Sequence, residues 1–142
     1  AYRSAENARA LRNPQKNFYK AFRMITLKRF FGNVGENMAA RYLRRNGYKI
    51  VEKNFAVHNV GEIDIIASSP EGILVFVEVK RRKNADFAEP SQNVDYNKRK
   101  RLTATARYYI SAKKIRIPTR FDVIEVIGRK VNHIIGAFYA EK

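Results

Sequence analysis

The hydrophobic and polar positions follow a regular pattern from residue 32 onward. Residues 33–46 carry apolar side chains at helical spacing, Asn33 stands where an N-cap residue is expected, and Gly47 is a usual C-terminal stop. The pattern therefore predicts a first helix over 33–46. The stripe that we expect to face the core consists of Ala39, Ala40 and Leu43.

Shorter segments rich in isoleucine and valine, bounded by turn residues, predict five strands. Their ranges are 49–57, 61–68, 73–81, 121–127 and 131–138. A second helix is predicted over 95–111. The residues of this helix that we expect in the core are Leu102, Ala106, Tyr109 and Ile110. The element order α-β-β-β-α-β-β predicts an α/β domain over 32–142.

The segments 61–68 and 73–81 form a predicted hairpin whose turn is centred on Glu71. Residues equally far from that centre should face each other, which gives the pairs Ile65 with Val77, Ile66 with Phe76, Asp64 with Glu78 and Glu62 with Lys80. The face expected to be wholly apolar carries Ile63, Ile65, Val75, Val77 and Val79. The other face is apolar near the turn and charged at its far end, which indicates a sheet covered on both sides with acids at its rim.

Asp64 and Glu78 are expected to face each other, and like charges in such a position are unfavourable. A divalent cation between the carboxylates, a proton shared by them, or an ion pair with Lys80 or a neighbouring arginine would each offset the repulsion. The plain structural alternative is a pair of acids that are solvated or salt-bridged at a strand end. The spacing favours a metal site and leaves these alternatives open.

Glu36 lies on the apolar stripe of the first predicted helix, three residues before Ala39. An acid in this position is expected to point toward the sheet. Asn33 and Glu36 also have the spacing of a capping box, in which the glutamate only bonds the amide of the N-cap residue. The sequence alone supports both interpretations equally.

Charge and composition narrow the partners and the metal chemistry. The 142 residues include 29 Lys and Arg against 13 Asp and Glu, and the formal net charge of +16 makes nucleic acid the first expected partner and an anionic membrane surface the second. No apolar run approaches the ~20 residues of a membrane span and no signal-peptide pattern is visible, so we expect a cytoplasmic protein without membrane association. The absence of cysteine and the presence of 2 His exclude thiolate and histidine-rich metal sites, which leaves an oxygen-held metal such as Mg²⁺.

Residues 1–31 form a basic N-terminal extension. They carry 8 Lys or Arg and the single acid Glu6, a net charge of +7. The second half of the extension is aromatic and has a helical pattern. An arm on nucleic acid, a partner-binding helix and a remnant of engineering are the interpretations that the sequence leaves open.

Several short motifs occur together in a specific order. They are Gly35-Glu36, Gly61-Glu62-Ile63-Asp64, Glu78-Val79-Lys80, Lys98 and Phe121-Asp122-Val123. In this combination, residues 32–138 resemble the YraN-like bacterial proteins, a family similar to the archaeal Holliday junction resolvases within the large Asp…Glu-x-Lys nuclease superfamily. The resemblance implies a restriction-endonuclease-like fold, a mixed β-sheet flanked by helices.

The resemblance also implies a role for each residue of the acid cluster. Asp64, Glu78 and Glu36 would bind Mg²⁺, or Mn²⁺ in its place, and Lys80 would orient or activate the attacking water. Glu62 would be a neighbour of the site. Six basic residues are expected to contact nucleic acid: Lys98, Arg81, Arg82, Lys83, Arg99 and Arg101.

Three functions follow as hypotheses. The first is a magnesium-dependent endonuclease that hydrolyses phosphodiester bonds in DNA, with branched or structured DNA as a candidate substrate. The second is a nucleic-acid-binding protein on the same fold that does not cut. The third is a basic partner of RNA or of the ribosome whose acids only satisfy Lys and Arg. By analogy with junction resolvases, a homodimer is also expected.

Overall fold

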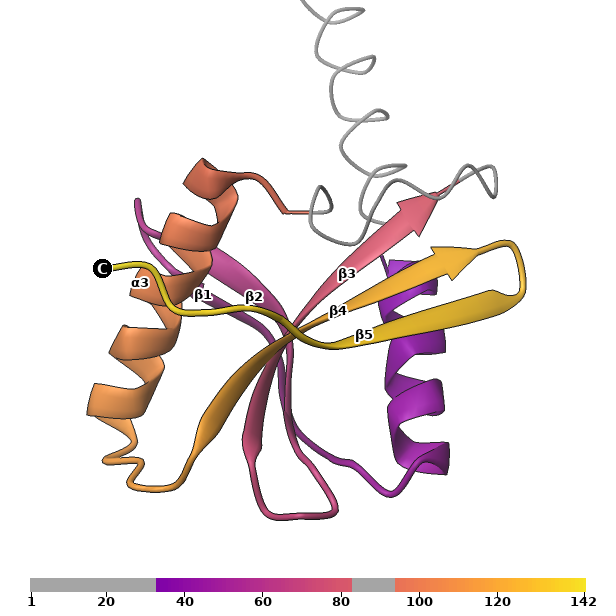
Figure 1. Ribbon diagram of the computed structural model, residues 1–142, viewed down its shortest axis with the longest axis horizontal. Coiled ribbons are helices and arrows are strands. Elements are labelled where there is room, and N and C mark those ends of the chain that lie inside the picture. Colours follow the sequence, from indigo (N-terminus) through magenta and orange to yellow (C-terminus); the bar gives the residue numbers. More distant parts are fainter. Residues whose placement is uncertain (1–32, 83–93) are drawn as a thin grey trace, which may run out of the picture. The chain divides into compact units, whose positions relative to one another are not determined.

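A five-stranded mixed sheet forms the centre of the protein, whose computed structural model describes residues 33–82 and 94–142 (Figure 1). The compact unit described here covers residues 35–142, and the predicted extension 1–31 lies outside the described residues. The strands are β1 (Lys49–Val57), β2 (Gly61–Ser68), β3 (Leu74–Arg82), β4 (Thr119–Ile127) and β5 (Lys130–Phe138). They lie side by side in chain order, with β3 and β4 parallel and the other neighbouring pairs antiparallel.

The helix α3 (Tyr96–Ala112) connects the parallel strands β3 and β4, as a parallel connection requires. Asp95 is its N-cap residue, because the Oδ1 atom of Asp95 accepts a hydrogen bond from the backbone amide of Lys98 at 2.8 Å. The α/β class and the predicted element order are therefore confirmed, and this order is compatible with a restriction-endonuclease-like fold.

A helix over residues 33–45 precedes β1 and ends in a Schellman motif. Gly47, whose φ is +82°, donates its amide to the carbonyl of Arg44, and the amide of Tyr48 bonds the carbonyl of Leu43. A positive φ favours glycine, which explains why the predicted stop lies here. Asn33 is already helical, so its predicted role as N-cap residue is wrong.

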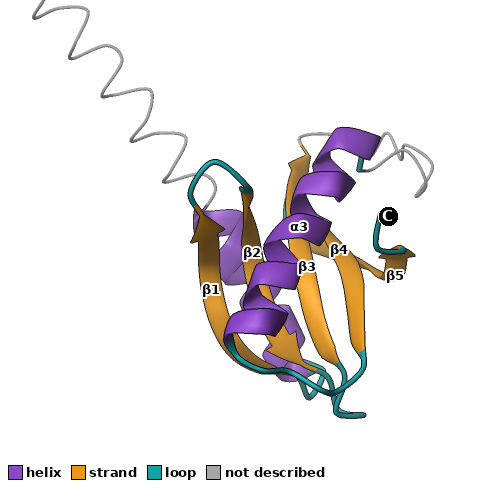
Figure 2. Ribbon diagram, turned by 90° about the vertical axis from the view of Figure 1, so that its left-hand side faces the viewer, coloured by secondary structure: helices purple, strands orange, loops and turns teal. Residues whose placement is uncertain are grey.

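The two helices of the described residues cover opposite faces of the sheet (Figure 2). The core under the helix of residues 33–45 contains Ala39, Ala40, Leu43, Tyr48, Ile65, Ala67, Val75, Val77, Ile124 and Val126. The core under α3 contains Ile63, Ile66, Leu74, Phe76, Val94, Leu102, Ala106, Tyr109, Phe121 and Val123. Coverage of both faces, which the hairpin pattern predicted, is confirmed, and it leaves the strand ends as the places where charged side chains can gather.

Pairing between β2 and β3 follows the predicted register only near the turn. Ile65 pairs with Val77, and this is the last pair of the ladder before Asp64. The predicted continuation of the ladder, Asp64 with Glu78 and Glu62 with Lys80, is wrong.

The face predicted for Ile63 is also wrong. Ile63 packs in the core under α3, whereas Ile65 packs in the core on the opposite face of the sheet. Two residues that are two apart share a face only in a regular strand, so the alternation of β2 is interrupted at Asp64. This interruption and the end of the ladder mark the position at which the acid cluster forms.

Candidate active site

Asp64 lies partly buried in β2, at the position where the pairing with β3 ends. Its Oδ2 atom accepts a hydrogen bond from the backbone amide of Val79 at 2.7 Å. Burial and then the nearby charge of Glu78 raise the pKa of Asp64 to about 7, although the Val79 amide and the charge of Lys98 act in the opposite direction. The predicted proximity of Asp64 and Glu78 is therefore confirmed, although their pairing in the ladder is not.

Glu78 lies in β3 and is 8% exposed. Its Oε1 atom is 3.1 Å from Nζ of Lys98 on α3, which forms an ion pair across the face of the sheet. Its Oε2 atom is buried and has no hydrogen-bond partner among the described residues. One oxygen of Glu78 is thus satisfied by a lysine, and the other is available to a ligand.

Glu36 reaches the cluster from the helix of residues 33–45. Its side chain has a hydrogen bond with Asn54 of β1, and its charge interacts with that of Asp64. Burial and then Asp64 raise the pKa of Glu36, and its Oε2 atom is buried without a hydrogen-bond partner in the described part of the chain. Of the two interpretations of Glu36, the structure supports the one in which the acid faces the sheet.

Lys80 follows Glu78 by two residues on β3 and is partly buried. Burial lowers the pKa of Lys80, the charge of Glu78 partly opposes this effect, and the positive charges of Arg82 and Lys98 add to it. Glu62 is exposed, and its negative charge contributes to the raised pKa of both Asp64 and Glu36. Glu62 is thus a neighbour of the cluster, as expected.

The repulsion between Asp64 and Glu78 is offset in this structure by Lys98 and by the raised proton affinity of Asp64. The lysine that forms the ion pair comes from α3, while the sequence pointed to Lys80. An ion pair is thus formed, with Lys98 in the place predicted for Lys80 or an arginine, and the raised pKa of Asp64 favours a proton on that carboxyl. Whether the cluster also suits a divalent cation depends on its donor atoms.

The carboxylate oxygens of the acid cluster are suitable ligands for a hard divalent cation. Carboxylate oxygens are the ligands that Mg²⁺ prefers, and both Glu36 and Glu78 keep a buried oxygen that lacks a hydrogen bond within the described residues. As the side chains stand, however, the described residues contain no group of three or more acids or histidines arranged to hold a metal ion. The cluster thus offers oxygen donors without a finished coordination site.

The basic residues predicted to contact nucleic acid differ in their surroundings. The Nε atom of Arg99 donates to Oε1 of Glu141 at 2.6 Å and its Nη1 atom donates to the carbonyl of Val94, so this guanidinium ties the C-terminal residues to α3. Arg82 lies 3.1 Å from the buried acid Glu125 of β4.

The remaining basic residues lie nearer to solvent. Arg101 is exposed and, together with Gly61 and Glu62, lines a shallow pocket of about 430 Å³ beside the acid cluster. Arg81 is exposed, and Lys83 lies outside the described residues. The structure brings Lys98 directly to the acids, through its ion pair with Glu78.

The buried acid Asp122 lies between β4 and β5, and both of its carboxylate oxygens have hydrogen-bond partners. Asp122 is 0% exposed and accepts hydrogen bonds from Nε and Nη2 of Arg120 at 2.7 and 3.0 Å and from the amide of Gly136 at 2.9 Å. Its Oδ2 atom is also 2.8 Å from Nε2 of His133. Burial alone would raise the pKa of Asp122, but the hydrogen bonds from His133, Arg120 and Gly136 hold it below its usual value. This network connects β4 to β5.

The sequence alone predicts no role for Asn54 or for the Asp122 network. Asn54 has a φ of +54° inside β1, and asparagine is among the few residues that adopt this conformation readily. A single asparagine within an otherwise regular strand pattern was the available signal. No periodicity could have predicted the partners of Asp122, because they meet where the register of β4 and β5 shifts.

The fold places this protein among α/β proteins with a restriction-endonuclease-like arrangement of sheet and helices. The chain belongs to the family described as Uncharacterised protein family UPF0102, whose model matches residues 35–126. This result confirms the YraN-like resemblance. The matched range includes every member of the acid cluster.

Relatives from distant bacteria are similar over most of the chain. A UPF0102 protein of Thermodesulfovibrio yellowstonii is 46% identical over 108 residues, which cover 76% of this chain and 95% of the relative. A UPF0102 protein of Clostridioides difficile is 46% identical over 110 residues, covering 75% and 95%. One of Bacteroides thetaiotaomicron is 43% identical over 112 residues, covering 76% and 91%. The similarity therefore extends over nearly the whole length of these relatives.

Proposed function

We propose that this protein is a metal-dependent endonuclease that hydrolyses phosphodiester bonds in DNA, with Mg²⁺ as its cofactor. The observation that carries the proposal is the acid cluster itself, in which Asp64 has a pKa of about 7 and Glu78 keeps a buried oxygen without a hydrogen bond in the described structure. Groups held in such perturbed states are typical of functional sites. The net charge of +16 suits a polyanionic substrate.

Asp64, Glu78 and Glu36 would hold the cation through their carboxylate oxygens. A bound Mg²⁺ polarises the phosphate and acidifies water, which are the contributions that phosphodiester hydrolysis needs from a metal. Each acid must be ionised to serve as a ligand. The raised pKa of Asp64 therefore means that metal binding and loss of its proton compete, and the metal should bind more weakly below pH 7.

The two lysines would serve the phosphate. Lys80, whose pKa is lowered by burial, holds its proton less tightly than a surface lysine and can orient the attacking water or transfer a proton. Lys98 now pairs with Glu78 at 3.1 Å and would turn to a phosphate oxygen once a substrate is bound. Together they would stabilise the negative charge that develops during hydrolysis.

A nucleic-acid-binding protein that does not cut is the second candidate. One observation favours it: Lys98 already occupies an oxygen of Glu78, and the acids of the described residues do not form a finished metal site. In this case the acid cluster would serve only to hold Lys98 and Lys80. Metal dependence separates the two candidates.

The test is a cleavage panel of single-stranded, duplex, flap and four-way-junction DNA, incubated with Mg²⁺, with Mn²⁺ or with EDTA. We expect the unmodified protein to cut at least one substrate with metal, and Asp64→Asn and Lys80→Met to lower the rate about 100-fold or more. Glu71→Gln, a surface acid in the turn between β2 and β3, is the matched control and should cut normally.

Two results would refute the proposal. The first is the absence of cutting by the unmodified protein on all four substrates with either metal, under conditions in which it binds them. The second is cutting that persists in Asp64→Asn at the unmodified rate, which would point to a contaminating nuclease.

A further inference from the structure

A groove lined by arginines lies apart from the acid cluster, between the helix of residues 33–45 and the turn that joins β4 to β5. Its volume is about 590 Å³. Its lining includes Met38, Arg41, Tyr42 and Arg45 from the helix and Arg129 and Val131 from the hairpin. We call it the arginine groove. The helical residues are spaced by three and four, which places them on one flank of the helix.

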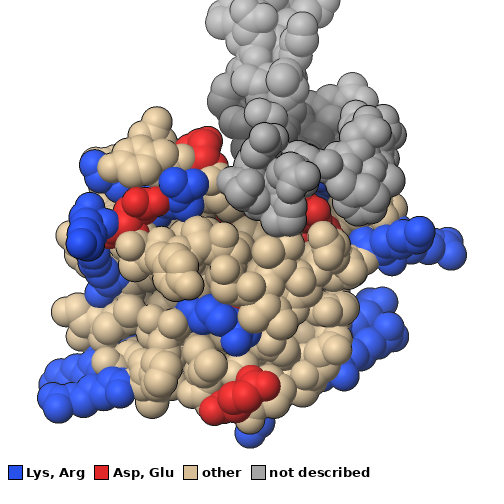
Figure 3. Space-filling model, viewed as in Figure 1, with Lys and Arg blue, Asp and Glu red and all other residues tan. Residues whose placement is uncertain are grey.

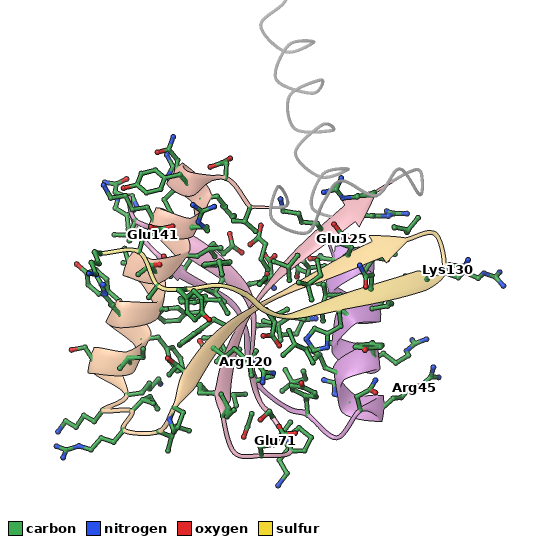
Figure 4. The ribbon with its side chains drawn as sticks, viewed as in Figure 1. Arg45, Glu71, Arg120, Glu125, Lys130 and Glu141 are labelled. Carbon is green, nitrogen blue, oxygen red and sulfur yellow. The ribbon has the colours of Figure 1, made fainter. Side chains whose placement is uncertain are left out.

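The hairpin holds Arg129 opposite that flank. Gly128 has a φ of +58° and stands first in a two-residue turn between β4 and β5, a position that favours glycine in a type II′ turn. Figure 4 shows the side chains of Arg45 and Lys130 extending outward on the same side of the molecule. In the space-filling view, Lys and Arg side chains project at that edge of the molecule and also at the opposite edge (Figure 3).

The arginines of this groove differ from the paired arginines elsewhere. Arg99 and Arg120 each contact a carboxylate, whereas Arg41, Arg45 and Arg129 have no acidic partner within residues 33–82 and 94–142. Exposed arginines are often simply solvated. Here three of them line a common hollow, and an anion that enters it would offset their mutual repulsion. Guanidinium groups bind phosphate oxygens through paired hydrogen bonds.

The net charge of the chain indicates which kind of partner can bind in the arginine groove. Residues 1–31 carry a net charge of +7 and a second copy of the protein carries +16, so both are repelled by the groove. A sugar–phosphate backbone is attracted. Arg41 and Arg45 are four residues apart, about 6 Å along the helix axis, which is close to two nucleotide steps of ~3.4 Å.

The groove and the acid cluster lie on different flanks of one helix. Glu36 faces the sheet, and Arg41 is five residues further along, about 140° around the helix from Glu36. A nucleic-acid segment in the groove is therefore distinct from the segment at the acids. We propose that the arginine groove binds the sugar–phosphate backbone of a second segment of the nucleic acid, flanking the one that the acid cluster contacts. Contact of the first segment with the acid cluster rests on the proposed function, whereas binding in the groove does not.

The test measures binding in EDTA, so that cleavage does not enter. Fluorescein-labelled duplex DNA is titrated with the unmodified protein, with Arg41→Gln/Arg129→Gln and with the control Arg44→Gln/Arg116→Gln, which removes the same charge from exposed arginines outside the groove. We expect the groove variant to bind about 10- to 60-fold more weakly at 100 mM salt. The slope of log K against log salt should become about 1.8 less steep, since each lost phosphate contact contributes about 0.9.

Equal weakening by the groove variant and the control would overturn the proposal, because it would reduce the groove to general surface charge. Polyglutamate that binds more tightly than DNA of equal total charge, with the same dependence on Arg41 and Arg129, would also overturn it, in favour of an acidic protein partner. Circular dichroism checks that each variant is folded, and Arg45→Gln provides a second groove variant. A protein that binds as expected and never cuts would refute only the nuclease proposal.

Discussion

Replacing Asp64 by asparagine should stabilise the metal-free protein above pH 7, although it removes a residue of the candidate active site. The folded state raises the pKa of this carboxyl from 3.8 to about 7, so folding favours its protonated form. The associated stability is complete below pH ~4, and it is lost as the pH rises toward 7. Asparagine has no charge to lose, and its oxygen can still accept the hydrogen bond from the amide of Val79.

The shift of about three pKa units corresponds to an upper limit of about 4 kcal/mol, at 1.36 kcal/mol per unit. Asp64 is partly exposed and its carboxylate also accepts the hydrogen bond of the Val79 amide, which reduces the measurable effect. We therefore expect the free energy of unfolding of the unmodified protein to fall by about 1–3 kcal/mol between pH 5 and pH 8, relative to that of Asp64→Asn.

The assay is urea unfolding of both proteins in EDTA at pH 5, 6, 7 and 8, with the difference in unfolding free energy plotted against pH. Glu71→Gln in the exposed turn is the control, and its curve should run parallel to that of the unmodified protein. If the curves of Asp64→Asn and the unmodified protein also run parallel from pH 5 to pH 8, Asp64 has no raised pKa. The electrostatic cost of holding a charged Asp64 in the acid cluster would then be absent.

Two further substitutions probe the ion pairs around the buried acids. Lys98→Met should raise the affinity for Mn²⁺ about tenfold in calorimetric titrations, because it frees the Oε1 atom of Glu78 that Lys98 now holds at 3.1 Å. Unchanged or weaker binding of Mn²⁺ would show that the metal ion and the ammonium group of Lys98 do not compete for Glu78. Asp122→Asn should lower the free energy of unfolding at pH 7 by about 3 kcal/mol, since it leaves Arg120 and His133 without their carboxylate. A loss below 1 kcal/mol in urea unfolding would contradict this network.

The bounds of the elements were largely predictable, because both periodicities are strong in this chain. The strands Lys49–Val57 and Gly61–Ser68 match their predicted ranges, and α3 is displaced by one residue. The largest difference is at β4, which begins at Thr119 and not at residue 121. Thr119 and Arg120 look like loop residues, and they become part of the strand only because they pair with β3, a tertiary effect that propensity does not contain.

The acid cluster was predictable in its members and less so in its contacts. The hairpin that was predicted from β2 and β3 brought Asp64, Glu78 and Lys80 to the same end of the two strands, although the regular alternation of β2 is interrupted at Asp64. The contact of Lys98 with Glu78 joins residues 20 positions apart and depends on how α3 packs on the sheet. Such a contact has no local signature. The arginine groove was missed for the same reason, because its two sides come from opposite ends of the domain sequence.

Asp64 and Asp122, two acids of this sheet, are in opposite electrostatic states, which indicates different roles. Asp122 is surrounded by donors from Arg120, His133 and Gly136, and its pKa is held low, as expected of an acid kept for stability. Asp64 is partly buried beside another acid in a chain with 29 Lys and Arg, and its pKa is raised to about 7 although the charge of Lys98 acts in the opposite direction.

Since the same fold satisfies one acid completely, the unfavourable state of Asp64 does not reflect a shortage of donors. An unfavourable electrostatic state of this kind persists in a protein where a bound ligand relieves it. We therefore attribute the acid cluster to metal and phosphate chemistry, and Asp122 to the stability of the fold. The opposite signs expected for Asp64→Asn and Asp122→Asn in unfolding at pH 8 follow directly from this distinction. If both substitutions destabilised the protein, the acid cluster would be part of the framework as well, and the main physical reason for placing an active site there would be lost.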